Sequence, residues 1–174
     1  HTEATDKAIE IALSVKDDFP NIKVAGSITT IEDCYRPDLV PPQDELEEEH
    51  GIQMELFKNS GIDMMFLETI NTIREADAIL KSSKDMNVPI FVSFVTDKEG
   101  NLMSGETIKE AIDKLSKYKI EGFMLNCRPP QILTIAAKKL AEVYKGTKGI
   151  YANGHGEPGD ELGWEFNKDF SPEE

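Results

Sequence analysis

Short apolar runs recur along the chain, and each is followed by polar residues and then by a segment with helical periodicity. The clearest run covers residues 122–125, which are continuously apolar and are followed by Asn126, Cys127, Arg128 and a proline pair. A continuous run of this kind predicts a parallel strand that is covered on both faces. The same pattern predicts strands at residues 23–28, 64–67, 89–95 and 149–152.

Helices are predicted between these strands from the spacing of their apolar residues. The spacing is nearest to ideal in residues 107–118, where the i, i+3, i+4, i+7 positions are Ile108, Ala111, Ile112 and Leu115. We expect the other helices at residues 3–19, 44–59, 73–83 and 131–144.

Two segments fall outside this alternation. Residues 29–44 form a long polar stretch with Cys34, Tyr35 and three prolines, and loops of this length in compact domains are usually functional or disordered. Asp44 at its end is expected to cap the helix that follows. The tail from Glu157 onward has no clear period, and we interpret it as a loop.

Five strand and helix pairs in one chain are typical of an α/β fold, and their spacing is that of a (β/α)8 TIM barrel. A closed barrel has eight such units and about 250 residues. We therefore predict that residues 1–174 form a single (β/α) barrel domain lacking roughly three strands, at its beginning and its end. The alternative at this stage is an open five-stranded sheet.

The composition limits the classes of partner. A net charge of −14 over 174 residues disfavours a nucleic acid and an anionic membrane surface, since both require a basic face. No apolar run approaches the roughly 20 residues that span a bilayer, and residues 1–6 lack the features of a secretory signal. Two cysteines suggest a reducing compartment, so we expect a cytoplasmic protein. No feature of the sequence specifies an oligomeric state.

Candidate chemistry gathers where the predicted strands end. The carboxyl ends of parallel strands open on one face of a barrel, so polar side chains that are distant in sequence converge there. The residues at these ends are Ser27, Glu68, Thr69, Ser93, Asn126, Cys127 and Asn153.

Cys127 permits two interpretations. A lone buried cysteine is usually inert packing. As a metal ligand it requires partners, because catalytic zinc sites have about three protein ligands. The sequence has neither a CxxC nor an HxxxH pattern, although Cys34 could reach the same face from its loop. The histidines, His1, His50 and His155, share no ligand spacing, and we interpret them as incidental.

Glu68 directly follows a buried run, so its carboxylate requires compensation for lost hydration. A substrate ammonium group would provide it. The alternative is an internal ion pair with Arg74 or Arg128.

Five of these strand-end segments together resemble the homocysteine S-methyltransferases, in the same order and spacing. The segments are Val24-Ala25-Gly26-Ser27-Ile28, Phe66-Leu67-Glu68-Thr69, Val92-Ser93-Phe94, Leu125-Asn126-Cys127 with Pro129-Pro130, and Tyr151-Ala152-Asn153-Gly154. The resemblance extends from Thr5 to Pro172. The loop at residues 32–38 departs from the glycine- and proline-rich loop of the better-known members and resembles a subgroup variant.

The resemblance implies a catalytic zinc held by three cysteine thiolates, of which Cys127 matches the first. The other two belong to a Gly-Gly-Cys-Cys motif on the last strand, and an Asp-Gly segment on the first strand helps to hold homocysteine. Neither segment occurs in residues 1–174, so we expect this chain to be the central part of a longer protein.

The resemblance also implies the reaction and its substrates. A zinc-dependent enzyme of this kind transfers a methyl group from a sulfonium, ammonium or folate donor to homocysteine and gives methionine. Glu68 would bind the substrate ammonium group, and Thr69, Ser93 and Asn126 would line the pocket. Asn153 would help to order the end of the pocket where the zinc is bound. Tyr35 could face a cationic donor through a cation–π contact.

Two other functions remain open at this stage. One is a non-catalytic barrel fragment that serves as a binding or assembly module, with Cys127 as packing. The other is a different barrel enzyme that uses Glu68 as a general base and works without a metal.

Overall fold

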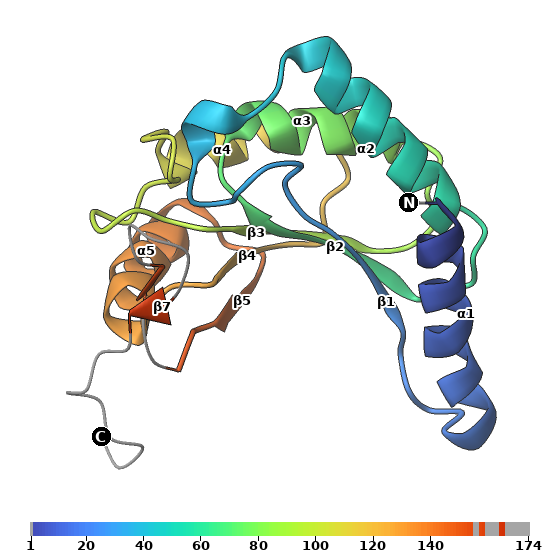
Figure 1. The fold of residues 1–174 in the computed structure, drawn as a ribbon. Helices are drawn as coiled ribbons and strands as arrows, with labels where there is room; N and C mark the ends of the chain where they lie inside the picture. The colour runs from blue at the N-terminus through green and yellow to red at the C-terminus, as the bar shows by residue number, and fades with distance from the viewer. Residues whose placement is uncertain (1, 155–156, 159–163, 166–174) are drawn as a thin grey trace.

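The computed structural model describes residues 2–154, 157–158 and 164–165 and shows a curved parallel sheet inside an arc of helices (Figure 1). Helices and strands alternate in the order predicted from the sequence. Their bounds are α1 (Thr2–Asp18), β1 (Ala25–Ile28), the 3-10 helix η1 (Pro37–Leu39), α2 (Gln43–Phe57), β2 (Met64–Ile70), α3 (Ile73–Ser82), β3 (Ile90–Phe94), α4 (Ile108–Leu115), β4 (Gly122–Asn126), α5 (Pro130–Val143) and β5 (Thr147–Tyr151).

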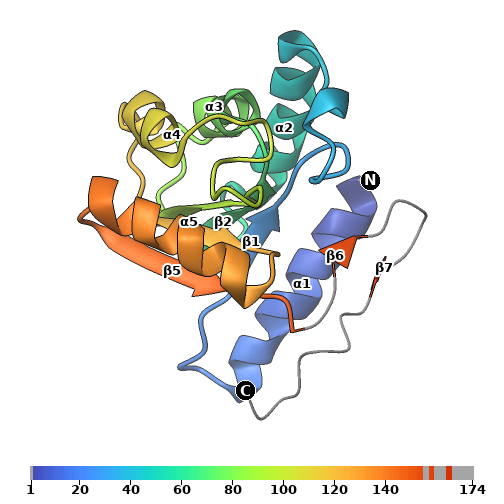
Figure 2. The same ribbon diagram turned by 90° about the vertical axis from the view of Figure 1, so that its left-hand side faces the viewer.

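The five strands lie side by side in sequence order, β1-β2-β3-β4-β5, and every neighbouring pair is parallel. This order follows from right-handed crossovers, in which each helix returns the chain to the start of the next strand. Figure 2 shows β5 and α5 forming one end of the arc, with the other strands behind them. The predicted α/β fold with five barrel units is therefore confirmed.

The core lies between the sheet and the helices. Along β1 to β4 alternate residues point outward to this core, and these are buried completely or nearly so, as with Met65, Leu67, Val92, Phe94 and Leu125. The helices supply Ala76, Ile79, Leu80, Ala111, Leu115, Ala136 and Leu140 to the same cluster. Burial of each large side chain stabilises the fold by about 1.5–3 kcal/mol.

The other face of the sheet is concave, and its residues are less apolar than the sequence pattern suggested. Phe66 and Phe91 stack there with ring centroids 5.1 Å apart, and both remain partly exposed. Ser27, Glu68, Ser93, Asn126 and Tyr151 belong to this face by the two-residue alternation of their strands. The alternation therefore places the polar side chains inside the arc.

Three local expectations were wrong. Strand β2 does not end before Glu68 but runs to Ile70, and its pairing with β3 shifts register between Leu67 and Ile70. Asp44 does not cap α2, because the helix begins at Gln43 with Pro42 at the N-cap position and no side-chain cap. In the tail, Glu157–Pro158 pairs with Trp164–Glu165 as strands β6 and β7. Among the described residues no helix is long and apolar enough to cross a membrane.

Candidate active site

The residues predicted at the strand ends meet on the concave face in two hydrogen-bonded groups. The first group joins Ser27, Glu68 and Tyr151 from β1, β2 and β5. The second joins Thr69, Ser93, Asn126 and Cys127 from β2, β3, β4 and the turn after β4. Convergence of side chains from five strands is what the parallel topology predicts.

Glu68 is held by two hydroxyl groups. The phenol of Tyr151 donates to Glu68 Oε1 at 2.6 Å, and the hydroxyl of Ser27 donates to Glu68 Oε2. Burial, followed by the contact with Glu68, raises the pKa of Tyr151, so its phenol remains a donor at neutral pH. Both carboxylate oxygens are thereby fixed in direction, and no described residue forms an ion pair with them.

The internal ion pair considered for Glu68 is absent from the described part of the chain. Arg74 donates instead to the carbonyl oxygens of Val40, at 3.0 Å, and Pro41. The guanidinium of Arg128 lies over the ring of Tyr35, with its central carbon 5.8 Å from the ring centroid. The negative charge of Glu68 thus faces the concave side of the sheet.

Asn126 organises the second group. Its side chain is 1% exposed, and its Oδ1 accepts hydrogen bonds from the Ser93 hydroxyl at 2.7 Å and from the backbone N–H of Thr69 at 3.3 Å. Its Nδ2 donates to Thr69 Oγ1 at 2.8 Å and to Cys127 Sγ at 3.1 Å. All these contacts define one orientation of the amide, in which one N–H points at Thr69 Oγ1 and the other at the thiol.

Thr69 and Cys127 both adopt left-handed backbone conformations, with φ values of 59° and 56°. Such conformations are uncommon for residues other than glycine, and a β-branched threonine there is a genuine outlier. Each costs of order 1–3 kcal/mol, and strain of this kind clusters at active sites. The two strained residues also touch, since Thr69 Oγ1 lies 3.7 Å from Cys127 Sγ.

The loop between β1 and α2 brings Tyr35 to the same place. The phenol of Tyr35 donates to the carbonyl oxygen of Cys127 at 2.7 Å. Burial and then the charge of Asp33 raise the pKa of the neighbouring Cys34 to about 12. Tyr35 therefore makes the contact between this loop and the Cys127 turn, and the reach of Cys34 to the Cys127 thiol stays a prediction.

Asn153 lies next to this turn. Its backbone N–H donates to the carbonyl oxygen of Arg128 at 3.1 Å. Burial raises the pKa of the nearby Tyr35 to about 12. Asn153 is thus placed beside the residues that flank the Cys127 thiol.

The described residues do not complete a metal site. Among them, no group of three His, Cys, Asp or Glu side chains is arranged to hold a metal ion. Cys127 offers one thiol with an amide donor beside it, which suits one ligand of a larger set. His50 is buried against Glu75, with Nε2 and Oε1 3.0 Å apart, as expected of an incidental histidine, while His1 and His155 lie outside the described residues.

Sequence reasoning missed the roles of Tyr151 and Tyr35. Tyr151 is two residues before Asn153 on a predicted strand, and the alternation of that strand was the signal that could have placed its phenol on the concave face. For Tyr35 no such signal exists, because its contact with Cys127 joins residues 92 positions apart through an irregular loop.

Comparison with protein families identifies one match along the whole chain. The family described as "Homocysteine S-methyltransferase" matches residues 1–174. Homocysteine S-methyltransferase 1 of Arabidopsis thaliana is 26% identical over 113 residues, which are 63% of this chain and 35% of that protein. The protein of the same name from Brassica oleracea var. italica is 28% identical over the same shares of both chains.

Solved structures show the same fold. The homocysteine methyltransferase MmuM from Escherichia coli superposes in its apo form with a TM-score of 0.76 and 18% identity, covering 87% of this chain and 59% of MmuM. Its metallated form superposes with a TM-score of 0.78 and 19% identity, covering 87% of this chain and 58% of MmuM. The chain therefore matches about a third of the length of the curated relatives and under two thirds of MmuM.

Proposed function

Since the chain belongs to the homocysteine S-methyltransferase family, we propose that it is the central part of a methyltransferase that converts homocysteine to methionine. The methyl group would come from a sulfonium, ammonium or folate donor. The observation that carries this proposal is the presence of a carboxylate, Glu68, and a thiol, Cys127, on one concave face. Homocysteine has an ammonium group at one end and a sulfur atom at the other, so these two groups suit its two ends.

Glu68 would bind the substrate ammonium group. Tyr151 and Ser27 use one lone pair on each carboxylate oxygen and leave the others to accept from an ammonium donor. Glu68 is followed directly in β2 by Thr69, whose Oγ1 lies 3.7 Å from Cys127 Sγ, so the carboxylate and the thiol belong to neighbouring parts of the site. A single amino-acid substrate could therefore contact both groups.

Thr69, Ser93, Asn126 and Asn153 would shape the pocket. The Asn126 amide would hold the Cys127 sulfur in place, Ser93 and Thr69 would keep that amide from rotating, and Asn153 would support the turn beyond the thiol. These residues contribute orientation, which lowers the entropy lost when the reacting atoms meet.

We propose zinc as the metal, with Cys127 as one of its ligands and the others outside the described residues. When bound, zinc lowers the pKa of a coordinated thiol and so supplies a thiolate at neutral pH. The proposed setting is the cytoplasm, because zinc–thiolate chemistry requires reduced cysteines.

The test is Cys127→Ser in the complete protein, with zinc content measured by elemental analysis and methyl transfer to homocysteine measured for each candidate donor. We expect both to be lost. Cys34→Ser is the matched control and should retain both. Zinc content and turnover that survive Cys127→Ser would refute the proposal.

A second function is favoured by one observation, the lack of a three-ligand cluster among the described residues. In that case the barrel would serve as a binding or assembly module, with Cys127 as packing. It predicts no stoichiometric zinc in the complete protein purified under reducing conditions, so the same elemental analysis separates the two functions.

A further inference from the structure

The contact between Tyr35 and Cys127 joins the β1–α2 loop to the turn that carries the thiol. The Tyr35 hydroxyl donates to the Cys127 carbonyl oxygen at 2.7 Å, and the side chain is partly buried. One face of its ring is covered by the Arg128 guanidinium. Tyr35 therefore contacts both residues of the Cys127-Arg128 pair.

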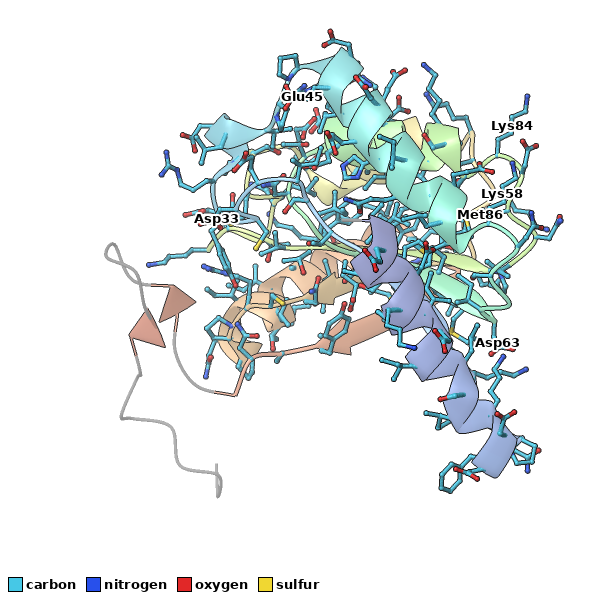
Figure 3. The ribbon with its side chains drawn as sticks, turned by 45° about the vertical axis from the view of Figure 1, so that its right-hand side comes forward. Asp33, Glu45, Lys58, Asp63, Lys84 and Met86 are labelled. Carbon is cyan, nitrogen blue, oxygen red and sulfur yellow. The ribbon has the colours of Figure 1, made fainter. Side chains whose placement is uncertain are left out.

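The loop that carries Tyr35 is itself anchored to the helices. The backbone N–H of Ile31 donates to the buried Glu75 carboxylate at 2.9 Å, and Arg74 holds the carbonyl oxygen of Val40 at 3.0 Å. Within the loop, the N–H of Tyr35 donates to Asp33 Oδ1 at 2.8 Å. Figure 3 labels Asp33 at this position, at the opposite end of the sheet from Asp63. Tyr35 is thus fixed on both sides and can act as a rigid support.

The Cys127 turn requires such support. Its φ of 56° is disfavoured for a residue with a side chain, so the surrounding contacts must maintain it. Two carbonyl groups in succession are held from outside the turn: that of Cys127 by Tyr35 and that of Arg128 by the N–H of Asn153. The conformation that they hold is the one in which Sγ lies 3.1 Å from Asn126 Nδ2.

We infer that Tyr35 is a positioning residue for the Cys127 thiol, acting through a hydrogen bond that holds the left-handed turn and so keeps the sulfur against the Asn126 amide. This inference deepens the proposed function, because it concerns the thiol on which that function rests. The expected cation–π contact of Tyr35 with a methyl donor stays a prediction, and it would use the ring face that Arg128 does not cover.

The test compares Tyr35→Phe with Tyr118→Phe in the complete protein. Both changes delete a phenol hydroxyl and keep the ring, but Tyr118 donates to Asp77 on α3 at 3.0 Å, away from the thiol. The readout is the alkylation rate of Cys127 by iodoacetamide, resolved by mass spectrometry of peptides from chelator-treated protein. Urea unfolding of both variants shows whether each remains folded.

We expect Tyr35→Phe to speed alkylation of Cys127 by up to about fivefold, because the loss of one ordinary hydrogen bond raises the equilibrium constant for opening of the turn by that factor. The rate rises because the half-buried sulfur is exposed to the reagent when the turn opens. Tyr118→Phe should leave the rate within about twofold of the parent, the scatter expected for a substitution that touches no part of the turn. An unchanged or slower rate in Tyr35→Phe would overturn the inference.

The experiment separates this inference from the proposed function, because alkylation requires neither homocysteine nor a metal. A faster rate in a protein that transfers no methyl group would support the positioning role alone. Active methyl transfer with an unaltered alkylation rate would refute the positioning role alone. In an active protein, the Tyr35→Phe variant should show a lower kcat with the KM for the donor unchanged.

Discussion

The phenol of Tyr151 on β5 donates a hydrogen bond to the carboxylate of Glu68 on β2 at 2.6 Å. Three strand spacings separate β2 from β5 in the sheet order, which is about 14 Å in a flat sheet. The contact is made because the sheet curves and its inner side chains converge, as the arc in Figure 1 shows. The curvature of the sheet therefore brings the phenol of Tyr151 to the carboxylate of Glu68.

Replacing Glu68 with glutamine tests the proposed role of this carboxylate. Glutamine keeps the shape but removes the charge that would bind the homocysteine ammonium. We expect the KM for homocysteine to rise about ten- to a hundredfold, since a hydrogen bond to a charged group contributes about 1.5–3 kcal/mol. Steady-state kinetics over a range of homocysteine concentrations measures it.

The control for this prediction is Tyr151→Phe, which leaves the Glu68 carboxylate in place and removes one of the two hydroxyl groups that donate to it. Its effect on the KM should be the smaller of the two, about tenfold or less. A Glu68→Gln variant with the KM of the parent would show that the carboxylate does not contact the ammonium group.

The sequence predicted the convergence of Ser27, Glu68, Ser93 and Asn126, because topology alone brings the ends of parallel strands together. It predicted wrongly that β2 ends at Leu67. Polar residues at the end of an apolar run resemble a loop, yet Glu68 and Thr69 stay in the strand and absorb a register shift with one left-handed residue. Strain of this kind leaves no pattern in the local sequence.

Contacts between elements that are distant in the sequence could not be predicted from the sequence either. His50 falls on the helix face that carries Leu46 and Met54, and its partner Glu75 is on the following helix. A glutamate in a helix is normally predicted to lie at the surface. Glu75 is nevertheless fully buried, and its Oε1 is contacted by both His50 and the N–H of Ile31. Only the packing of α2 on α3 determines this pairing.

Removing the Glu75 side chain should destabilise the protein strongly. Glu75→Ala leaves the buried His50 ring and the Ile31 N–H without their acceptor, and each buried donor left unpaired costs about 1–3 kcal/mol. Urea unfolding measures the loss. Glu48→Ala, an exposed glutamate on α2, is the matched control and should change the free energy of unfolding by about 0.5 kcal/mol or less. Equal losses in the two variants would contradict the buried pairing.

Two glycine substitutions should change stability in opposite directions. A Cβ on Gly122 would lie 2.7 Å from the backbone oxygen of Thr147 on the adjacent strand, so β4 and β5 would have to separate. We expect Gly122→Ala to cost about 1–3 kcal/mol. A Cβ on Gly51 meets nothing closer than 3.7 Å, and Gly51 lies inside α2, where alanine is favoured by up to about 1 kcal/mol.

Thermal unfolding of the two variants beside the parent checks this prediction. The Tm should fall for Gly122→Ala and rise for Gly51→Ala. A Gly122→Ala variant as stable as the parent would mean that the strands at this point are further apart than the structure shows.

Asp63 should contribute to the acid sensitivity of the fold, through its contacts at the start of β2 (Figure 3). Lys16 on α1 lies 2.7 Å from Asp63 Oδ2, and the N–H of Val24 donates to the same oxygen at 2.8 Å. These contacts, that with Lys16 foremost, lower the pKa of Asp63 from 3.8 to about 2. Because the folded pKa is the lower one, the stabilisation is complete above the unfolded value and is lost as the pH falls toward the folded value.

The measurement is urea unfolding of the parent and of Asp63→Asn at several pH values. The difference between their midpoints should be constant above about pH 4 and should shrink steadily from about pH 4 to about pH 2, the window between the two pKa values. In a Lys16→Met background most of this pH-dependent difference should vanish, because the largest cause of the lowered pKa has been removed. A difference between parent and Asp63→Asn that stays the same at every pH would show that the Asp63 carboxylate is not held by Lys16 in solution.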